Sequence, residues 1–194
     1  AAYAAHADAV SVLCDSQDFG GSFQLLSQVS SQLQQPTLAK EFIIDARQIA
    51  LAESSGASAV LLIVAILDNS ALEHLLITAL DLRCDVLLEI HTEAELLRCA
   101  KVLNTLPISL QKKIALGINN RSLDTLKIDL KVTETLAPLA RKTLPNVGCI
   151  VCESGIESAA DIKRLRQYVD AFLIGTSILT SSNPASFLTS LKQA

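Results

Sequence analysis

The chain has 194 residues, with 16 Lys and Arg against 20 Asp and Glu, which gives a formal net charge of −4. This length is typical of one domain, and the acidic balance argues against a nucleic-acid binder, which needs excess cations to neutralise phosphates. Hydrophobic residues make up 50% of the chain, which excludes a disordered protein. Charged residues interrupt every apolar run before the ~20 residues that a membrane span requires.

Short apolar runs rich in β-branched residues recur along the chain and alternate with helical patterns. Runs of this kind, with little polar alternation, are typical of parallel strands that are buried on both faces. The strands predicted in this way are residues 9–13, 36–44, 59–67, 85–91, 113–119, 147–153 and 171–175.

Helical patterns fill the intervals between these runs. Residues 70–83 place their leucines along one stripe. Residues 92–103 begin with a Thr-x-x-Glu sequence, Thr92 to Glu95, which predicts a capping box. The last helix is expected to begin at Asn183, a cap residue followed by proline at the first turn.

Seven strands alternating with seven helices are connected most naturally by parallel crossovers. A doubly wound sheet and a (β/α)8 TIM barrel share this periodicity, but no Gly-x-Gly-x-x-Gly follows the first strand. In a barrel the carboxyl ends of the strands converge on the catalytic mouth. Here those ends carry polar or small residues, namely Asp15, Lys40, Glu89, Asn119, Glu153 and Gly175. We therefore expect a single barrel domain over residues 1–194 whose missing first strand precedes Ala1 or has been lost.

Lys40, Glu89 and Glu153 are the candidate catalytic residues. A lysine at a barrel mouth suits a Schiff base or a general acid, although a lysine at a strand end also snorkels to the surface. Buried carboxylates need a cation or a ligand. The three residues therefore fit either acid–base chemistry around one substrate or a structural ion-pair network.

Small-residue turns follow the last two predicted strands. Ser154-Gly155 and Gly175-Thr176 each precede a helical segment, so their backbone N–H groups are positioned to hold a phosphate. In barrels, the last two loops of this kind often form such a site. The sequence thus favours a barrel of the phosphate-binding type.

The histidines and cysteines do not form metal-ligand spacing. His74 lies in a predicted helix and is expected at the surface, whereas His91 shares the face of Glu89 or caps the next turn. Cys149 and Cys152 are three apart in a strand and so point to opposite faces, which favours buried spectators over a metal or redox site. Five cysteines without regular spacing favour a reducing compartment, and we expect the cytoplasm.

Several stretches resemble the indole-3-glycerol-phosphate synthase family of tryptophan biosynthesis. They are AKEFIID (39–45), GASAVLLIVAIL (56–67), LLEIHTEAEL (87–96), LGINNRSL (116–123), ESGI (153–156) and FLIGTSIL (172–179), while DFGGSF (18–23) resembles a loop of the family. The resemblance implies a TIM-barrel lyase that converts 1-(2-carboxyphenylamino)-1-deoxyribulose 5-phosphate into indole-3-glycerol phosphate, with loss of CO2 and water. It implies no metal and no organic cofactor.

The resemblance also implies roles for the candidate residues. Lys40 is expected to protonate the ketone oxygen during ring closure, and Glu89 to assist proton transfer and stabilise positive charge near the aniline nitrogen. Asn119 and Glu153, with Ser154 beside them, are expected to hold substrate hydroxyls. The expected substrate-binding residues are Phe19, Phe42 and Leu61 against the anthranilate ring and Arg121 toward an anionic substrate. The expected phosphate cradle consists of Gly155, Gly175 and Thr176.

The chain departs from the family at its beginning. The family's first strand supplies a Glu-x-Lys pattern, whereas this chain starts after it, so that residues 1–8 are expected to end the first helix. Methionine is absent, also at position 1, as is typical of a fragment or a processed chain. The activity of the 194-residue chain is therefore left open.

Two other functions are compatible with the sequence. One is another phosphosugar barrel enzyme, such as phosphoribosylanthranilate isomerase, and the other is an inactive barrel that serves as a scaffold. The expected partners are the small-molecule substrate and a phosphoribosylanthranilate isomerase domain or other tryptophan-pathway enzymes, with no nucleic acid and no membrane.

Overall fold

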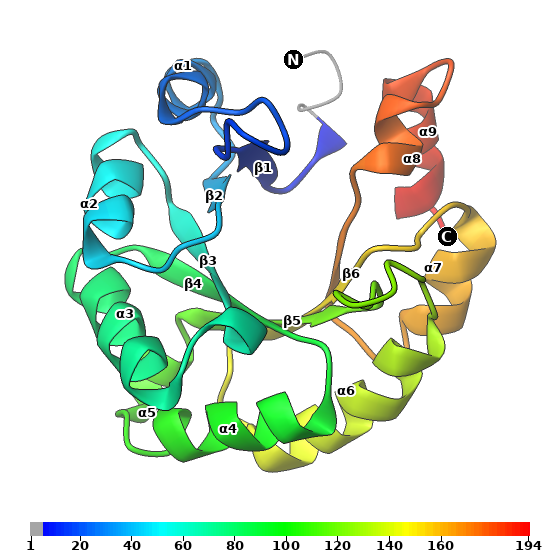
Figure 1. The fold of residues 1–194 in the computed structure, drawn as a ribbon. Helices are drawn as coiled ribbons and strands as arrows, with labels where there is room; N and C mark the ends of the chain where they lie inside the picture. The colour runs from blue at the N-terminus through cyan, green and yellow to red at the C-terminus, as the bar shows by residue number, and fades with distance from the viewer. Residues whose placement is uncertain (1–5) are drawn as a thin grey trace. The chain divides into compact units, whose positions relative to one another are not determined.

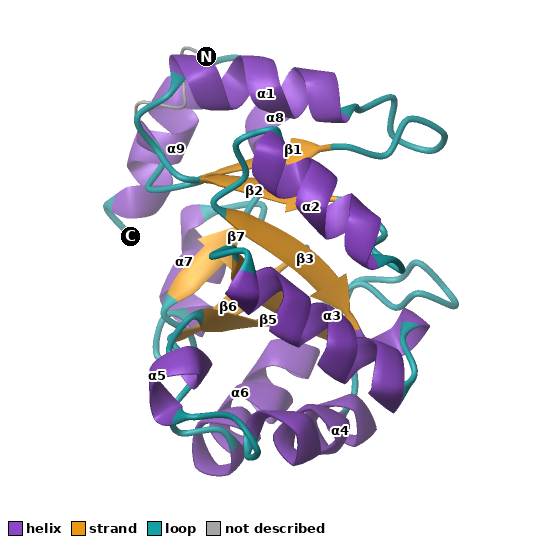
Figure 2. Ribbon diagram, turned by 90° about the vertical axis from the view of Figure 1, so that its left-hand side faces the viewer, coloured by secondary structure: helices purple, strands orange, loops and turns teal. Residues whose placement is uncertain are grey.

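The computed structural model describes residues 6–194, which divide into two compact units, residues 6–88 and 89–194. The boundary falls within strand β4 (Asp85–Ile90). In each unit, parallel strands alternate with helices along the chain (Figures 1 and 2). Residues 1–5 of the segment expected to end the first helix lie outside the described part of the chain.

The first unit contains three complete strands and most of β4. Its strands are β1 (Val10–Leu13), β2 (Thr37–Lys40) and β3 (Ala59–Ile63), and its helices are α1 (Phe23–Gln32), α2 (Ala46–Ser54), the 3-10 helix η2 (Val64–Ile66) and α3 (Asn69–Asp81). The three strands pair in parallel, with Leu13 opposite Lys40 and Leu38 opposite Ala59. Helices α2 and α3 pack against each other, as Figure 1 shows.

The second unit repeats the same arrangement. Its strands are β5 (Ile114–Asn119), β6 (Cys149–Glu153) and β7 (Ala171–Leu173), and its helices are α4 (Glu93–Leu103), α5 (Ile108–Gln111), α6 (Lys131–Thr143), α7 (Ala159–Leu165), α8 (Thr176–Leu179) and α9 (Pro184–Lys192). The strands are again parallel, and Asn119 of β5 lies opposite Glu153 of β6. This register brings two candidate site residues side by side.

The strands follow chain order from β1 to β7, as successive β-α-β crossovers produce. Strands β3, β4 and β6 are buried over all but their first residue, which is expected of parallel strands covered on both faces. The seven predicted strands are confirmed, with shorter bounds. The largest differences are at residues 36–44, where the strand ends at Lys40, and at residues 59–67, where the strand ends at Ile63 and the chain continues as η2.

The helix caps follow the sequence with one correction. Asn183 caps α9 by accepting a hydrogen bond from the Ser186 N–H (3.1 Å), as expected. At α4 the Thr92 hydroxyl accepts from the Glu95 N–H (3.2 Å). The predicted reciprocal bond is wrong, because the Glu95 carboxylate instead accepts from the N–H of His91, one residue earlier. Among residues 6–194, no helix is long and apolar enough to cross a membrane.

Candidate active site

Lys40 is the last residue of β2 and is half-buried. It lies opposite Leu13 of β1, and the Cys14 N–H donates to the Lys40 carbonyl (3.0 Å), which extends the pairing by one residue. The sheet therefore fixes the backbone on which the lysine side chain stands. This is the strand-end position that the sequence predicted for Lys40.

Two phenylalanines that follow β1 and β2 meet above this edge of the first unit. The rings of Phe19 and Phe42 lie 6.3 Å apart between centroids, and they are 56% and 40% exposed as residues. The Asp15 carboxylate accepts from the Phe19 N–H (3.1 Å), and the Gln48 side chain donates to the Phe42 carbonyl (3.1 Å). Exposed aromatic rings held by such backbone contacts present an apolar surface to a ligand.

Leu61, the third member of the expected apolar wall, differs from the two rings. It lies within β3 and is 2% exposed. Its side chain is therefore part of the core of the first unit and offers little surface of its own.

Two glutamates of the second unit are buried in strands. Glu89 of β4 is 2% exposed and Glu153 of β6 is 1% exposed. The imidazole of His91 lies beside Glu89, with 3.4 Å between its Nε2 and Glu89 Oε1. The distance is that of an ion pair, but the alignment is not that of a hydrogen bond. His91 therefore shares the face of Glu89, one of the two positions that the sequence left open.

Asn119 and Ser154 are joined at the carboxyl ends of β5 and β6. The Ser154 hydroxyl donates to Asn119 Oδ1 (2.8 Å), which also accepts from the Arg121 N–H (3.0 Å). The Arg121 guanidinium donates to the Leu126 carbonyl of its own loop (3.3 Å). The structure thus brings together Asn119, Glu153 and Ser154, which the family resemblance implies as one group, and Arg121 begins the loop beside them.

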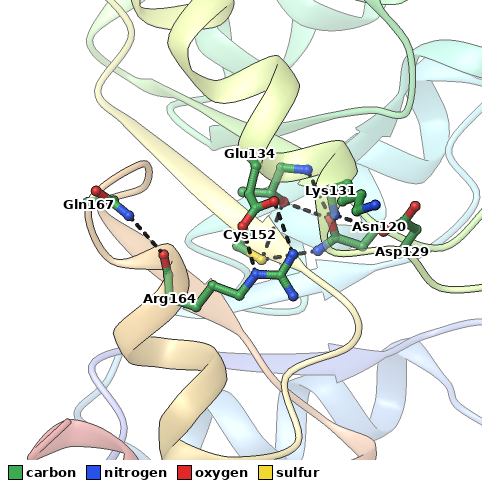
Figure 3. Close-up of polar contacts among 8 residues, drawn as sticks. Asn120, Asp129, Lys131, Glu134, Cys152, Arg164 and Gln167 are labelled. Carbon is green, nitrogen blue, oxygen red and sulfur yellow. Dashed lines mark hydrogen bonds and ion pairs between the residues drawn. The ribbon is translucent and has the colours of Figure 1, made fainter.

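Asn120, which the sequence analysis did not single out, fixes the backbone at this point. Its side-chain amide lies 3.0 Å from both the Glu153 and the Ser154 carbonyls and donates to them, and it also contacts the sulfur of Cys152 (3.2 Å). Its carbonyl oxygen accepts from the N–H and the hydroxyl of Thr133. Figure 3 shows Asn120 beside Cys152. Because Asn120 is 2% exposed, these contacts are shielded from water.

The two glycine turns after β6 and β7 are tied to each other. The Ser177 hydroxyl donates to the Ile156 carbonyl (2.7 Å). Gly155 has a φ of +87°, and a Cβ there would lie 2.5 Å from Ile128 Cγ2, whereas a Cβ at Gly175 would meet no atom within 4 Å. Packing accounts for the glycine at position 155, and the turn at Gly175 and Thr176 is open.

The cysteine thiols are poor acid–base groups in this structure. Burial raises the pKa of Cys14 and Cys84 to about 11 and that of Cys99 to about 12, and it also raises the pKa of Cys149 and Cys152. Within residues 6–194, no three His, Cys, Asp or Glu side chains are grouped to hold a metal ion. His74 lies exposed on α3, as expected.

Parallel strands with helices between them, and polar side chains at the carboxyl ends of those strands, define a protein of the β/α-barrel class. A solved structure supports this class. The match to the 3-hexulose-6-phosphate synthase from Salmonella typhimurium has a TM-score of 0.72 and 14% sequence identity. It covers 99% of this chain and 90% of the synthase chain. At this identity the likeness shows the fold, and the predicted barrel class is confirmed.

The family model described as indole-3-glycerol phosphate synthase matches residues 1–191, and the chain belongs to that family. The indole-3-glycerol phosphate synthase of Lachnospira eligens is 38% identical over 98% of this chain and 69% of its own length. The tryptophan biosynthesis protein TrpCF of Vibrio parahaemolyticus is 40% identical over 93% of this chain. The chain spans about a third of that relative, 36% of its length.

Proposed function

We propose that the protein is an indole-3-glycerol-phosphate synthase, a carboxy-lyase of tryptophan biosynthesis. The substrate is 1-(2-carboxyphenylamino)-1-deoxyribulose 5-phosphate, and the products are indole-3-glycerol phosphate, CO2 and water. The observation that carries the proposal is the meeting of Asn119, Glu153 and Ser154 at the ends of paired strands in a chain of this family. These polar groups suit a substrate rich in hydroxyls.

The proposed reaction needs acid–base groups and a shaped site. Lys40 donates a proton to the ketone oxygen as the anthranilate ring carbon attacks the ketone carbon. The carboxylate leaves as CO2 and its bonding electrons restore the aromatic ring. The new hydroxyl then takes up a proton and departs as water, while the adjacent CH2 carbon loses a proton and the C=C bond of the indole forms. Glu89 moves a proton during these steps and stabilises positive charge near the aniline nitrogen.

The remaining assignments concern binding. Phe19 and Phe42 offer exposed rings for the anthranilate ring, whereas Leu61 is buried within β3. Arg121 favours the anionic substrate. The phosphate is assigned to the linked turns that contain Gly155, Gly175 and Thr176, where backbone N–H groups serve as donors.

The raised thiol pKa values speak against the isomerase alternative. Phosphoribosylanthranilate isomerase is expected to use a cysteine and an aspartate as acid and base. Cys14 follows β1 directly, but its pKa of about 11 keeps the thiol protonated near neutral pH. A protonated, buried thiol is a poor base, and the synthase is the better supported function.

The test is indole formation by the full-length protein, followed by its ultraviolet absorbance. Lys40→Ala should lower kcat about 100-fold or more, because it removes the proposed general acid. Lys163→Ala, which removes an exposed lysine of α7, should leave kcat unchanged. Unaltered turnover by Lys40→Ala would contradict the role of Lys40, and turnover of phosphoribosylanthranilate without indole formation would favour the isomerase. Substrate binding without turnover would favour the scaffold.

The proposed partner is a phosphoribosylanthranilate isomerase domain. The proposal is supported by the TrpCF relatives from two Vibrio species, because this chain matches 36% of their length and the rest leaves room for a second domain. Size determination of the native protein, with a substrate screen for both reactions, tests this partner.

A further inference from the structure

Asn120 and Thr133 form a buried, hydrogen-bonded pair next to the carboxyl end of β6. Asn120 directly follows β5, and Thr133 lies in the first turn of α6. Asn120 Oδ1 accepts from both the backbone N–H (3.1 Å) and the hydroxyl (2.8 Å) of Thr133. Because both residues are buried, water does not replace either bond when it is lost.

These two bonds decide how the side-chain amide of Asn120 is turned. A backbone N–H can only donate, so the Thr133 N–H must face the oxygen of the amide. The amide nitrogen then faces β6, where it lies 3.0 Å from the carbonyl oxygens of Glu153 and Ser154. Each of the two amide hydrogens thus has a carbonyl acceptor, and the sulfur of Cys152 is a further, weak contact at 3.2 Å (Figure 3).

The two carbonyls fix the backbone at the point where β6 ends. Ser154 has a φ of +64°, a conformation that persists only where surrounding contacts hold it. The Asn120 amide donates to the carbonyls of the peptide groups before and after Ser154. The Ser154 hydroxyl, whose backbone is held in this way, donates to Asn119 Oδ1 (2.8 Å), which also accepts from the Arg121 N–H (3.0 Å).

We propose that Asn120 is a positioning residue for the hydroxyl-binding group, which consists of Asn119, Glu153 and Ser154, and that Thr133 sets the orientation of Asn120 from α6. Asn120 acts through the backbone of β6 and does not itself contact the substrate. The inference rests on the proposed function, in which the hydroxyl-binding group holds the substrate hydroxyls. Loss of the Thr133 hydroxyl should therefore weaken substrate binding, although Thr133 belongs to a helix and is buried.

The effect on binding must be separated from an effect on stability. Removal of either partner leaves a buried polar group with fewer hydrogen bonds, which lowers the free energy of unfolding whether or not the pair positions the site. A positioning role adds a change in KM in protein that is still folded. The variants are therefore compared in the full-length protein, at a temperature at which circular dichroism shows each of them folded.

The sharpest comparison is between two substitutions at Thr133. Thr133→Val keeps the branched shape but removes the hydroxyl, whereas Thr133→Ser keeps the hydroxyl. We expect KM to rise about tenfold in Thr133→Val, with kcat within about threefold of the wild type, and KM to stay within about twofold in Thr133→Ser. Thr143→Val is the matched control, because the hydroxyl of Thr143, at the end of the same helix, donates to the Leu139 carbonyl (2.8 Å).

Asn120→Asp tests the amide itself. Aspartate has nearly the same shape, but in place of the amide nitrogen it puts an oxygen that cannot donate beside two carbonyl oxygens. We expect KM to rise about 30-fold, with Asn104→Asp at an exposed asparagine as control. If Asn120→Asp does not fold, the Thr133 variants decide. A wild-type KM in folded Asn120→Asp or in Thr133→Val, or an equal rise in Thr133→Ser, would overturn the inference.

A second measurement does not depend on activity. Hydrogen exchange followed by NMR reports the local opening of single amides. The Arg121 N–H, whose acceptor is Asn119, should exchange about tenfold faster in Thr133→Val. The Gly148 N–H, which donates to the Ile114 carbonyl (2.8 Å) where β5 and β6 begin, should keep its rate.

The two exchange rates also separate the failure of this inference from the failure of the proposed function. An unchanged rate at Arg121, or an equal acceleration at Arg121 and Gly148, would show that Thr133 does not act on this end of the strands and would overturn the inference. If the wild type forms no indole, the proposed function fails, and the exchange rates alone decide whether Thr133 and Asn120 position Ser154.

Discussion

At the residue scale, the turn after β6 carries the most strained backbone of the candidate site. Ser154 and Gly155 adopt φ values of +64° and +87° in succession. A positive φ is costly for a residue with a side chain, so the contacts of Ser154 with Asn119 and Asn120 must hold this conformation. The hydroxyl of Ser154 consequently points at Asn119 in a fixed direction.

Substitution of Gly155 by alanine should destabilise the protein by about 2–4 kcal/mol. The new Cβ adds strain at positive φ and would lie 2.5 Å from Ile128 Cγ2 and 3.0 Å from Leu130 Cδ2, so that the loop before α6 must shift. Urea unfolding followed by circular dichroism measures the change in the free energy of unfolding.

Gly20→Ala is the matched control for this prediction. Gly20 has a φ of +64°, but a Cβ there meets no atom within 4 Å. Its substitution should cost about 1 kcal/mol, the penalty for the left-handed backbone alone. Equal losses of unfolding free energy in the two variants would show that the contacts with Ile128 and Leu130 do not contribute to the effect of Gly155→Ala.

Individual site residues differed in how readily the sequence revealed them. Lys40, Glu89 and Glu153 stand out because a charged residue at the end of an apolar strand is unusual. Asn120 was missed because it lies one residue beyond the predicted strand 113–119, which ends at Asn119. The difference is tertiary, since Asn120 is buried and bonds to groups 32 to 34 residues away, which periodicity does not report.

At the element scale, all seven strands were predictable from apolar runs, but their ends were not. Residues 59–67 read as one continuous run, yet the strand ends at Ile63 and η2 follows. Hydrophobicity does not mark this change, because Val64 of η2 and Leu67 after it are buried like the strand residues before them. Polar cap residues, in contrast, marked the starts of α4 and α9 correctly.

Removal of the α9 cap should lower stability by about 1 kcal/mol. Asn183→Ala removes the oxygen that accepts from the Ser186 N–H. Because an N–H in the first turn has no backbone acceptor within the helix, this donor is then left without a hydrogen bond in the protein. Asn183→Asp should restore most of the loss, because a carboxylate accepts the same bond and favours the positive end of the helix dipole. Thermal unfolding measures both, and an alanine variant as stable as the wild type would contradict the cap.

At the scale of the whole molecule, charge balance excluded classes of function but could not place a site. The net charge of −4 argued against nucleic acid, and the chemistry proposed above rests on family membership. What joins Asn119 to Ser154 is the register of β5 with β6, a property of the folded chain. A sequence read one element at a time predicts strand ends but not which of them lie opposite each other.

Acid should destabilise the protein through carboxylates whose pKa values are lowered in the folded state. The pKa of Asp45 is lowered to about 2 by hydrogen bonds from Arg47. That of Asp170 is also lowered, because its bonds to Arg141 and the Ile150 N–H outweigh burial. A depressed pKa means that the unfolded chain binds protons first, so this stability is complete above about pH 5 and is lost as pH falls toward 2.

Asp170→Asn should therefore flatten the acid limb of the stability curve. The variant loses the ion pair of Asp170 with Arg141 (2.9 Å), which is worth about 0.5 kcal/mol because both side chains are partly exposed to solvent. It should be less stable than the wild type at pH 7, whereas the two should converge near pH 2, where the wild-type carboxyl is protonated as well. Urea midpoints between pH 2 and pH 7 measure this, with Asp81→Asn at an exposed aspartate as control. A constant difference across that range would mean that the charge of Asp170 contributes nothing and that only its hydrogen bond to Ile150 matters.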